Sequence, residues 1–175
     1  MAEPRQDSVR RIEEALRAAG ISARIVDLPQ SARTAKDAAA AIGCRVEQIA
    51  KSIVFRRTDV DRPVLVVASG PNRVDEGLAA SHFDAAIVKA DADFVRSSTG
   101  FAIGGVPPLG HDTPIETLID RDLLGFDTIW AAAGTPNAVF SIDPKELVRA
   151  TGGRVLAIAT TSGAPIRPDT PPSPR

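Results

Sequence analysis

The sequence predicts an α+β domain with a mixed, largely antiparallel sheet or barrel and helices packed outside it. Three observations support this fold class. Strand-like segments outnumber helical ones, and most of them follow one another through short turns, as hairpins do. The 175 residues, 43% of them hydrophobic, are enough to bury one core. We therefore expect a single domain over residues 1–161.

The first quarter of the chain predicts two helices around a strand. From residue 8 to residue 19 apolar side chains recur with helical spacing, and Gly20 stands where a C-terminal cap is expected. Residues 22–28 alternate polar and apolar positions, which indicates a strand. A second helix is predicted between Thr34, a favoured N-cap residue, and Gly43.

The middle of the chain predicts the centre of the sheet. Residues 51–57 and 63–69 are β-rich and are separated by a short polar turn, so they predict a hairpin of central strands. A helix over residues 74–83 and a strand over residues 85–90 follow. Asp91 is placed to cap a further short helix.

The last third predicts short strands, one more helix and a tail. Asp143 is expected to cap the helix, and Pro144 occupies its favoured first position. Residues 162–175 contain five prolines and no apolar pattern, so we expect a disordered tail there. The predicted elements are strands at residues 114–120, 128–134, 138–142 and 154–159 and a helix at residues 143–153.

The composition narrows the classes of function. A net charge of −1 argues against wrapping a long nucleic acid such as DNA, although it permits contact with a short tRNA acceptor end. Cys44 and the widely separated His82 and His111 form no metal-ligand pattern, so we expect neither a metal nor another cofactor. The chain has a charged, helical start and no apolar run of about 18 residues. We therefore expect a cytoplasmic protein without a membrane partner.

Common catalytic motifs are missing from the chain, and this directs attention to Lys51. There is no GxxxxGK[ST], no GxSxG and no HExxH. Lys51 begins an apolar run, residues 51–55, that is too apolar for a surface edge. An ammonium group there is partly desolvated and needs an anionic or polar partner, such as a ligand phosphate or carboxylate. An ordinary solvated lysine is the alternative.

A second candidate is the glycine- and proline-rich segment GFAIGGVPPLGH at residues 100–111. Glycine opens additional backbone conformations and lets a ligand approach the main chain, whereas proline fixes φ. The segment is therefore expected to be rigid. Two interpretations stay open. It is either a tight connection between strands or a preorganised floor of backbone N–H and C=O groups under a small ligand.

Four segments, AKSIVF, VLVVASGPNRVD, TGFAIGGVPPLGH and WAAAGTPNAVF, occur in an order and spacing that resemble the YbaK-like aminoacyl-tRNA deacylases. These proteins are free-standing relatives of the editing domain of bacterial prolyl-tRNA synthetases. The resemblance runs from about residue 34 to residue 159. It implies hydrolysis, in trans, of the ester between a wrong amino acid and the terminal adenosine of a tRNA(Pro)- or tRNA(Cys)-related substrate. It leaves open whether an aminoacyl-tRNA synthetase takes part.

The resemblance also implies roles for individual residues. Lys51 would hold the terminal nucleotide. Backbone groups of the loop from Gly104 to Pro108, with Gly104 and Gly105 as the catalytic positions, would position the ester and the attacking water or substrate group. The prolines would keep this surface from reorganising as negative charge develops. The further positions implied at the substrate are Val106, Pro107, Pro108, Gly110, His111, Gly134 and Asn137.

Simpler interpretations compete with some of these assignments. His111 has the chemistry of a general base, but it could equally close the loop by hydrogen bonding. Asn72 and Asn137 stand in turn-like sequence, where asparagine is common in any case. Val106 and Pro107 replace the Cys-Ser pair of the family's type member beside the aminoacyl group. The identity of the amino acid therefore stays open.

Two other functions share these features. A non-catalytic module of the same fold would bind aminoacyl-tRNA or a synthetase without turnover. A small-ester hydrolase would act on an ester unrelated to tRNA. Lys51 and the intact GGVPP segment favour the editing hydrolase over the binding module, and the weak net charge keeps the small-ester hydrolase open.

Overall fold

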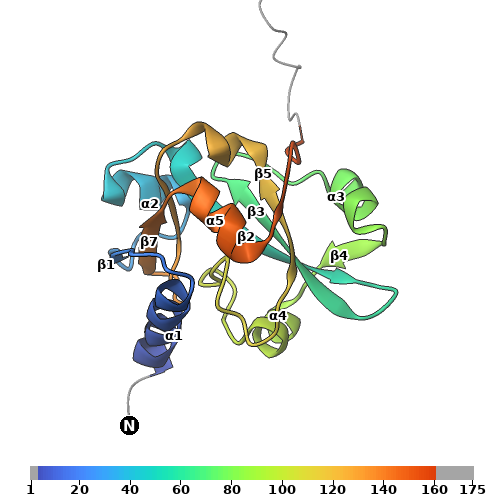
Figure 1. Ribbon diagram of the computed structural model, residues 1–175, viewed down its shortest axis with the longest axis horizontal. Helices are drawn as coiled ribbons and strands as arrows, with labels where there is room; N and C mark the ends of the chain where they lie inside the picture. Colours follow the sequence, from blue (N-terminus) through green and yellow to red (C-terminus); the bar gives the residue numbers. More distant parts are fainter. Residues whose placement is uncertain (1–3, 161–175) are drawn as a thin grey trace, which may run out of the picture.

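The computed structural model describes residues 4–160, which form an eight-stranded sheet with helices around it (Figure 1). The sheet does not follow the order of the chain, because its first and seventh strands pair at one edge. In sheet order the strands are β1 (Ile25–Asp27), β7 (Ala138–Ile142), β6 (Ile129–Ala132), β2 (Ile49–Arg57), β3 (Arg62–Ser69), β5 (Glu116–Asp120) and β8 (Arg154–Leu156), and β4 (Ile87–Lys89) pairs with β2 off this path.

The sheet is mixed, and the predicted α+β fold class is confirmed. The pairs β1–β7, β2–β3, β2–β4 and β6–β7 are antiparallel, and β2–β3 and β6–β7 are the hairpins that the sequence indicated. The pairs β2–β6, β3–β5 and β5–β8 are parallel. Parallel neighbours need long crossover connections, which short-range turn signals do not reveal.

The predicted helices are all present, and their caps are those expected. Thr34 and Asp37 form a capping box, and Gly43 ends the same helix with a φ of 84°. Asp143 caps the last helix, and its side chain accepts a hydrogen bond from Lys145 N. The helices are α1 (Pro4–Ala18), α2 (Ala35–Ile42), α3 (Glu76–Phe83), α4 (Ala92–Thr99) and α5 (Pro144–Thr151), and shorter 3₁₀ turns lie at Val46–Gln48 and Arg121–Gly125.

β3 lies beside β2 in the middle of the sheet, and it separates two apolar clusters. Every residue from Val64 to Ser69 is at most 1% exposed. Leu65 and Val67 face a large cluster that includes residues of α1 and α4, whereas Val64 and Val66 face a smaller one under α3. Burying side chains of this size contributes about 1.5–3 kcal/mol each. The β2–β3 hairpin therefore packs against both apolar clusters of the core.

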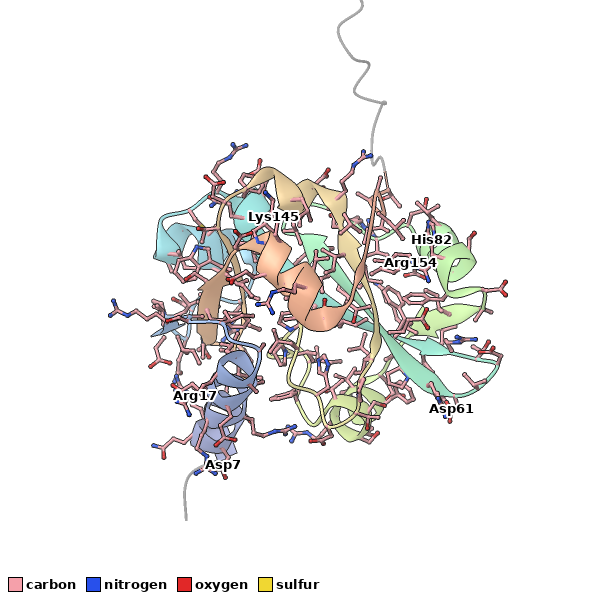
Figure 2. All side chains as sticks on the ribbon, viewed as in Figure 1. Asp7, Arg17, Asp61, His82, Lys145 and Arg154 are labelled. Atoms are coloured by element: carbon pink, nitrogen blue, oxygen red, sulfur yellow. The ribbon has the colours of Figure 1, made fainter. Side chains whose placement is uncertain are left out.

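Helix α1 covers one end of the sheet and lies beside the loop that follows α4 (Figure 1). Ile12 and Leu16 are 0% and 2% exposed, so this face of the helix belongs to the core. Asp7 and Arg17 lie outside that face (Figure 2). Among residues 4–160, no helix combines the length and the apolar character that crossing a membrane requires.

The last described residues return to the turn after β3. Ala159 bridges Val74, and Asp75 N donates to Ile158 O. Arg154 on β8 lies beside His82 on α3, where Arg154 Nη1 donates to the His82 carbonyl oxygen over 3.4 Å (Figure 2). The tail predicted over residues 162–175 lies outside the described residues.

Candidate active site

Lys51 lies near the start of β2, directly after the 3₁₀ turn, and its side chain is half-buried. Its Nζ donates a hydrogen bond of 2.8 Å to the Asn72 carbonyl oxygen. Burial lowers the pKa of Lys51 below its ordinary value, and the nearby Asp120 carboxylate acts in the opposite direction. The lysine is therefore a partly desolvated cation, as the sequence predicted, with a single neutral acceptor as its hydrogen-bond partner.

The turn that holds Asn72 is fixed by a buried carboxylate. Asp120, at the end of β5, is 1% exposed and accepts hydrogen bonds from Ser69 N at 3.0 Å and Asn72 Nδ2 at 2.8 Å. Asn72 Nδ2 also donates to Asp122 over 2.7 Å. These bonds set the direction of the Asn72 carbonyl and so the position of Lys51 Nζ. Asp120 was not among the residues predicted at the site, although an aspartate that ends an apolar strand is a usable signal.

A cavity of about 370 Å³ opens beside Lys51. Three of the residues predicted at the site line it: Lys51, Gly104 and Val106. The cavity thus brings together the two candidates, the lysine and the glycine-proline loop, from positions 53 residues apart. The lining residues that the site prediction did not include are Ser52, Ile53, Val54, Phe55, Asn72, Arg73, Val74, Glu76, Lys89, Ala90, Val95 and Ile103.

Gly104 and Gly105 have different surroundings. Gly104 lines the cavity with a φ of 88°, and the nearest atom to a Cβ added there is Pro136 Cγ at 3.7 Å. Gly105 is buried, and an added Cβ would lie 2.7 Å from the Thr135 Cα. Gly104 is thus the glycine at which a ligand can approach the backbone, while Gly105 allows two loops to pack together.

The rear half of the loop turns away from the cavity. Pro108, Gly110 and His111 line a separate hollow of about 220 Å³. His111 Nε2 lies 2.8 Å from the Pro107 carbonyl oxygen, so the Nε2–H tautomer donates a bond that closes the loop. Burial lowers the pKa of His111, which favours that neutral tautomer. This geometry supports loop closure as the role of His111.

Gly134 and Asn137 secure a second loop, residues 133–137, and neither lines the 370 Å³ cavity. Asn137 Nδ2 donates to Pro29 O over 3.1 Å, and the Asn137 carbonyl accepts a 2.6 Å bond from Leu28 N. Gly134 has a φ of 95°, and a Cβ there would lie 2.9 Å from the carbonyl oxygen of Ser8. Both residues therefore hold the second loop in place, and Thr135 of that loop packs against Gly105.

The cavity has polar and apolar walls. Arg73 and Lys89 line it, and neither forms an ion pair within residues 4–160. Glu76, at the first turn of α3, is the acidic residue of the lining. Ile103 is 54% exposed and adds an apolar surface. In the described part of the chain no three His, Cys, Asp or Glu side chains are grouped so as to hold a metal ion.

The fold is that of an aminoacyl-tRNA editing domain. The model of the family described as "Aminoacyl-tRNA editing domain" matches residues 29–150, and this chain belongs to that family. The YbaK-like resemblance is therefore confirmed.

Individual relatives agree with this assignment. The uncharacterized protein YwhH of Bacillus subtilis (strain 168) is 32% identical over 123 residues, which cover 70% of this chain and 78% of YwhH. A crystal structure described as a proposed trans-editing enzyme for prolyl tRNA synthetase is 45% identical, with a TM-score of 0.83 over 87% of this chain and 97% of that one. The hypothetical protein APE2540 is 29% identical, with a TM-score of 0.79 over 86% of this chain and 99% of that one.

Proposed function

We propose that this protein is a deacylase that hydrolyses the ester of mischarged tRNA in trans, as one domain over residues 1–161. The observation that carries the proposal is that Lys51 and Gly104 line one cavity of about 370 Å³ in an aminoacyl-tRNA editing domain. A cavity of this volume suits a small ligand, such as the aminoacylated end of a tRNA. The acceptor end is thus the partner, and the rest of the tRNA stays outside the cavity.

Each side chain has a definable task in this reaction. The Lys51 ammonium attracts a phosphate of the terminal nucleotide, because its own partner is the neutral Asn72 carbonyl. Gly104 lets the ester approach the backbone without a Cβ in the way. A water oxygen attacks the ester carbon, the bond to the ribose oxygen breaks, and a proton passes from the water to that leaving oxygen. The products are the free amino acid and the intact tRNA.

tRNA(Pro) is the first substrate to examine. The support for this choice is the 45% identity to the proposed trans-editing enzyme for prolyl tRNA synthetase. tRNA(Cys) is the second, from the YbaK-like resemblance. Val106 lines the cavity, so its side chain is in a position to contact the amino acid. A synthetase is not needed for the chemistry proposed here, and the reaction is assigned to a cytoplasmic protein acting on free mischarged tRNA.

The proposal is tested by deacylation of a panel of mischarged tRNA(Pro) and tRNA(Cys) species by wild type, Lys51→Ala and Lys89→Ala. Lys51→Ala should lower the rate on the preferred substrate about 100-fold or more, since it removes a charge-assisted contact inside the site. Lys89→Ala is the matched control. It removes a lysine that lines the same cavity but whose side chain, unlike that of Lys51, donates to no backbone carbonyl within residues 4–160. Its effect should stay below about tenfold. EDTA should leave all rates unchanged.

Three results would contradict the proposal. Hydrolysis by Lys51→Ala at the wild-type rate would show that Lys51 is not part of the site. Hydrolysis of simple aminoacyl esters at the rate of aminoacyl-tRNA would indicate a small-ester hydrolase, and tight binding of mischarged tRNA without turnover would indicate a binding module.

A further inference from the structure

The sheet has a gap along one edge of β2, beside the cavity. β3 pairs with β2 from Ala50 to Arg57 and occupies its other edge. The gap edge is shared by two short strands: β6 pairs with Ile49 and Ala50, and β4 pairs with residues 55–57. Ala90 N reaches back to the Val54 carbonyl oxygen over 3.3 Å. Between these two ladders one stretch, residues 51–53, has no neighbouring strand.

Ser52 presents its backbone to this gap. In an antiparallel ladder the N–H and C=O groups of one residue point to one edge, and those of the next residue point to the other. The Val54 carbonyl points to the gap edge, because it accepts from Ala90 N, and Ser52 stands two residues before Val54. The Ser52 N–H and C=O therefore share that edge. In the described chain no hydrogen bond from β6, β4 or any loop reaches them.

A second observation marks the same residue. The Ser52 hydroxyl oxygen is buried and has no hydrogen-bond partner within residues 4–160. Unsatisfied buried polar atoms are rare, because each costs about 1–3 kcal/mol. Ser52 also lines the 370 Å³ cavity together with Lys51 and Gly104. An unpaired backbone edge and an unpaired hydroxyl thus lie in one cavity, and the backbone edge is where a ligand can form hydrogen bonds.

We infer that the aminoacyl group of the substrate pairs with Ser52 as a one-residue strand. Its α-amino group donates to the Ser52 carbonyl, and its ester carbonyl accepts from the Ser52 N–H. This inference rests on the proposed function. Ser52 is the one residue of the gap whose backbone N–H and C=O face this edge, and an α-aminoacyl ester likewise carries one residue's donor and acceptor on one edge. It uses the mode by which peptides add to open sheet edges.

This pairing has two consequences for the reaction. The Ser52 N–H polarises the ester carbonyl and stays bonded to its oxygen as negative charge develops during attack by water. The pairing also involves only atoms common to all α-amino acids, so it holds the group whatever its side chain. Discrimination between amino acids then falls to the residues around the side chain, such as Val106.

The test uses the full chain and a non-hydrolysable ligand, 3′-deoxy-3′-(L-alanylamino)adenosine, with adenosine as the reference. Amide hydrogen exchange at Ser52 should slow at least about tenfold with the alanylamino ligand, as one hydrogen bond of about 1.4 kcal/mol implies. The Ile53 amide, which already bonds β3, is the internal control and should not change. Adenosine alone should leave Ser52 unprotected.

A second arm examines the α-amino group. The 3′-propionylamino analogue lacks this amine, and it should bind about tenfold more weakly than the alanylamino ligand. The ratio should persist in Glu76→Gln, because the carbonyl of Ser52 and not that carboxylate holds the amine. A ratio that disappears in this variant overturns the inference, as does protection of Ser52 by adenosine alone.

The outcomes also separate this inference from the proposed function. Equal affinity of the two amides, with continued hydrolysis of mischarged tRNA, would overturn the pairing and leave the deacylase assignment standing. Failure of both amides to bind would overturn the pairing, because it does not depend on the side chain. Failure of mischarged tRNA to be hydrolysed as well would remove the proposed function with it.

Discussion

Gly104 and Gly105 are neighbours in the sequence, yet they face different regions of the molecule. Gly104 faces the cavity that holds Lys51, and Gly105 packs on the backbone of Thr135. The same division continues along the loop, because Val106 lines the cavity and His111 is bonded behind it. The loop thus has one side that faces the cavity and another side that packs against the rest of the protein. The two regions should respond differently to the same kind of substitution.

The largest loss of stability is expected from Gly105→Ala, on the side of the loop that packs against Thr135. The new methyl group would meet the backbone of Thr135 at 2.7 Å, and backbone cannot move aside as a flexible side chain can. Overpacking of this kind typically costs about 1–3 kcal/mol, and a contact with backbone lies at the upper end of that range. Chemical denaturation should therefore show a large loss in the free energy of unfolding. Wild-type stability in this variant would mean that the two loops are not held together.

Gly104→Ala tests the side of the loop that faces the cavity. The methyl group meets nothing closer than 3.7 Å, so packing is preserved, and the positive φ costs about 1–2 kcal/mol. Single-turnover deacylation should fall about 100-fold, as for loss of one oxyanion-type contact. The comparison is sharpest when both alanine variants are measured for stability and rate together. If Gly104→Ala lost stability but kept the wild-type rate of deacylation, Gly104 would have only a structural role in the turn.

A smaller effect is expected from pH, through His111. Burial places the pKa of His111 in the folded protein below its unfolded value, so the unfolded chain binds the proton more readily. The contribution is therefore fully present above the unfolded pKa and is lost as the pH falls from there through the folded pKa. Between about pH 7.5 and pH 5, stability should decrease by at most about 1.4 kcal/mol per unit, and less in His111→Gln. Arg11 and Asp112 are the charged neighbours, and they act in opposite directions. Equal slopes in the two proteins would argue against a buried His111.

The smallest effect is expected from Arg11→Gln, which removes the contacts of this α1 residue with Phe101 and Asp112. The Arg11 guanidinium lies 4.5 Å from the centre of the Phe101 ring and forms a 2.6 Å ion pair with Asp112. Both contacts are partly solvated, so their loss should cost less than about 1 kcal/mol. High salt should reduce the difference between wild type and variant. A loss of stability as large as that of Gly105→Ala would mean that the ion pair between Arg11 and Asp112, and not the packing of the two loops, holds this side of the loop in place.

The sequence could predict the elements of this fold because their signals are local. Thr34, Gly43 and Asp143 cap the helices they were expected to cap, and the hairpin of β2 and β3 was read from two β-rich runs around a turn. The parallel pairs could not be read in this way, since they join strands that are distant in the chain. Pairing across a sheet depends on crossovers, which leave no short-range pattern.

The site was less accessible from the sequence, for a related reason. Lys51 and the loop could be singled out by residue type, but the difference between Gly104 and Gly105 depends on Thr135, which approaches only after folding. Asn137 was expected at the substrate, and its amide instead bonds Pro29. Asp120 and the gap at Ser52 were missed because a buried carboxylate and an unpaired strand edge are defined by what surrounds them.

The family match covers residues 29–150, but the buried core extends beyond both of these limits. Ile12 and Leu16 of α1 are core residues, and Ile12 Cδ1 lies 3.0 Å from a Cβ placed on Gly110 in the loop. At the other end Ile158 is 0% exposed and belongs to the smaller cluster under α3. A gene fragment cut at the family boundaries would therefore encode the cavity without α1, which packs on its loop, and without Ile158. Grafting this domain onto another protein requires both segments to be included.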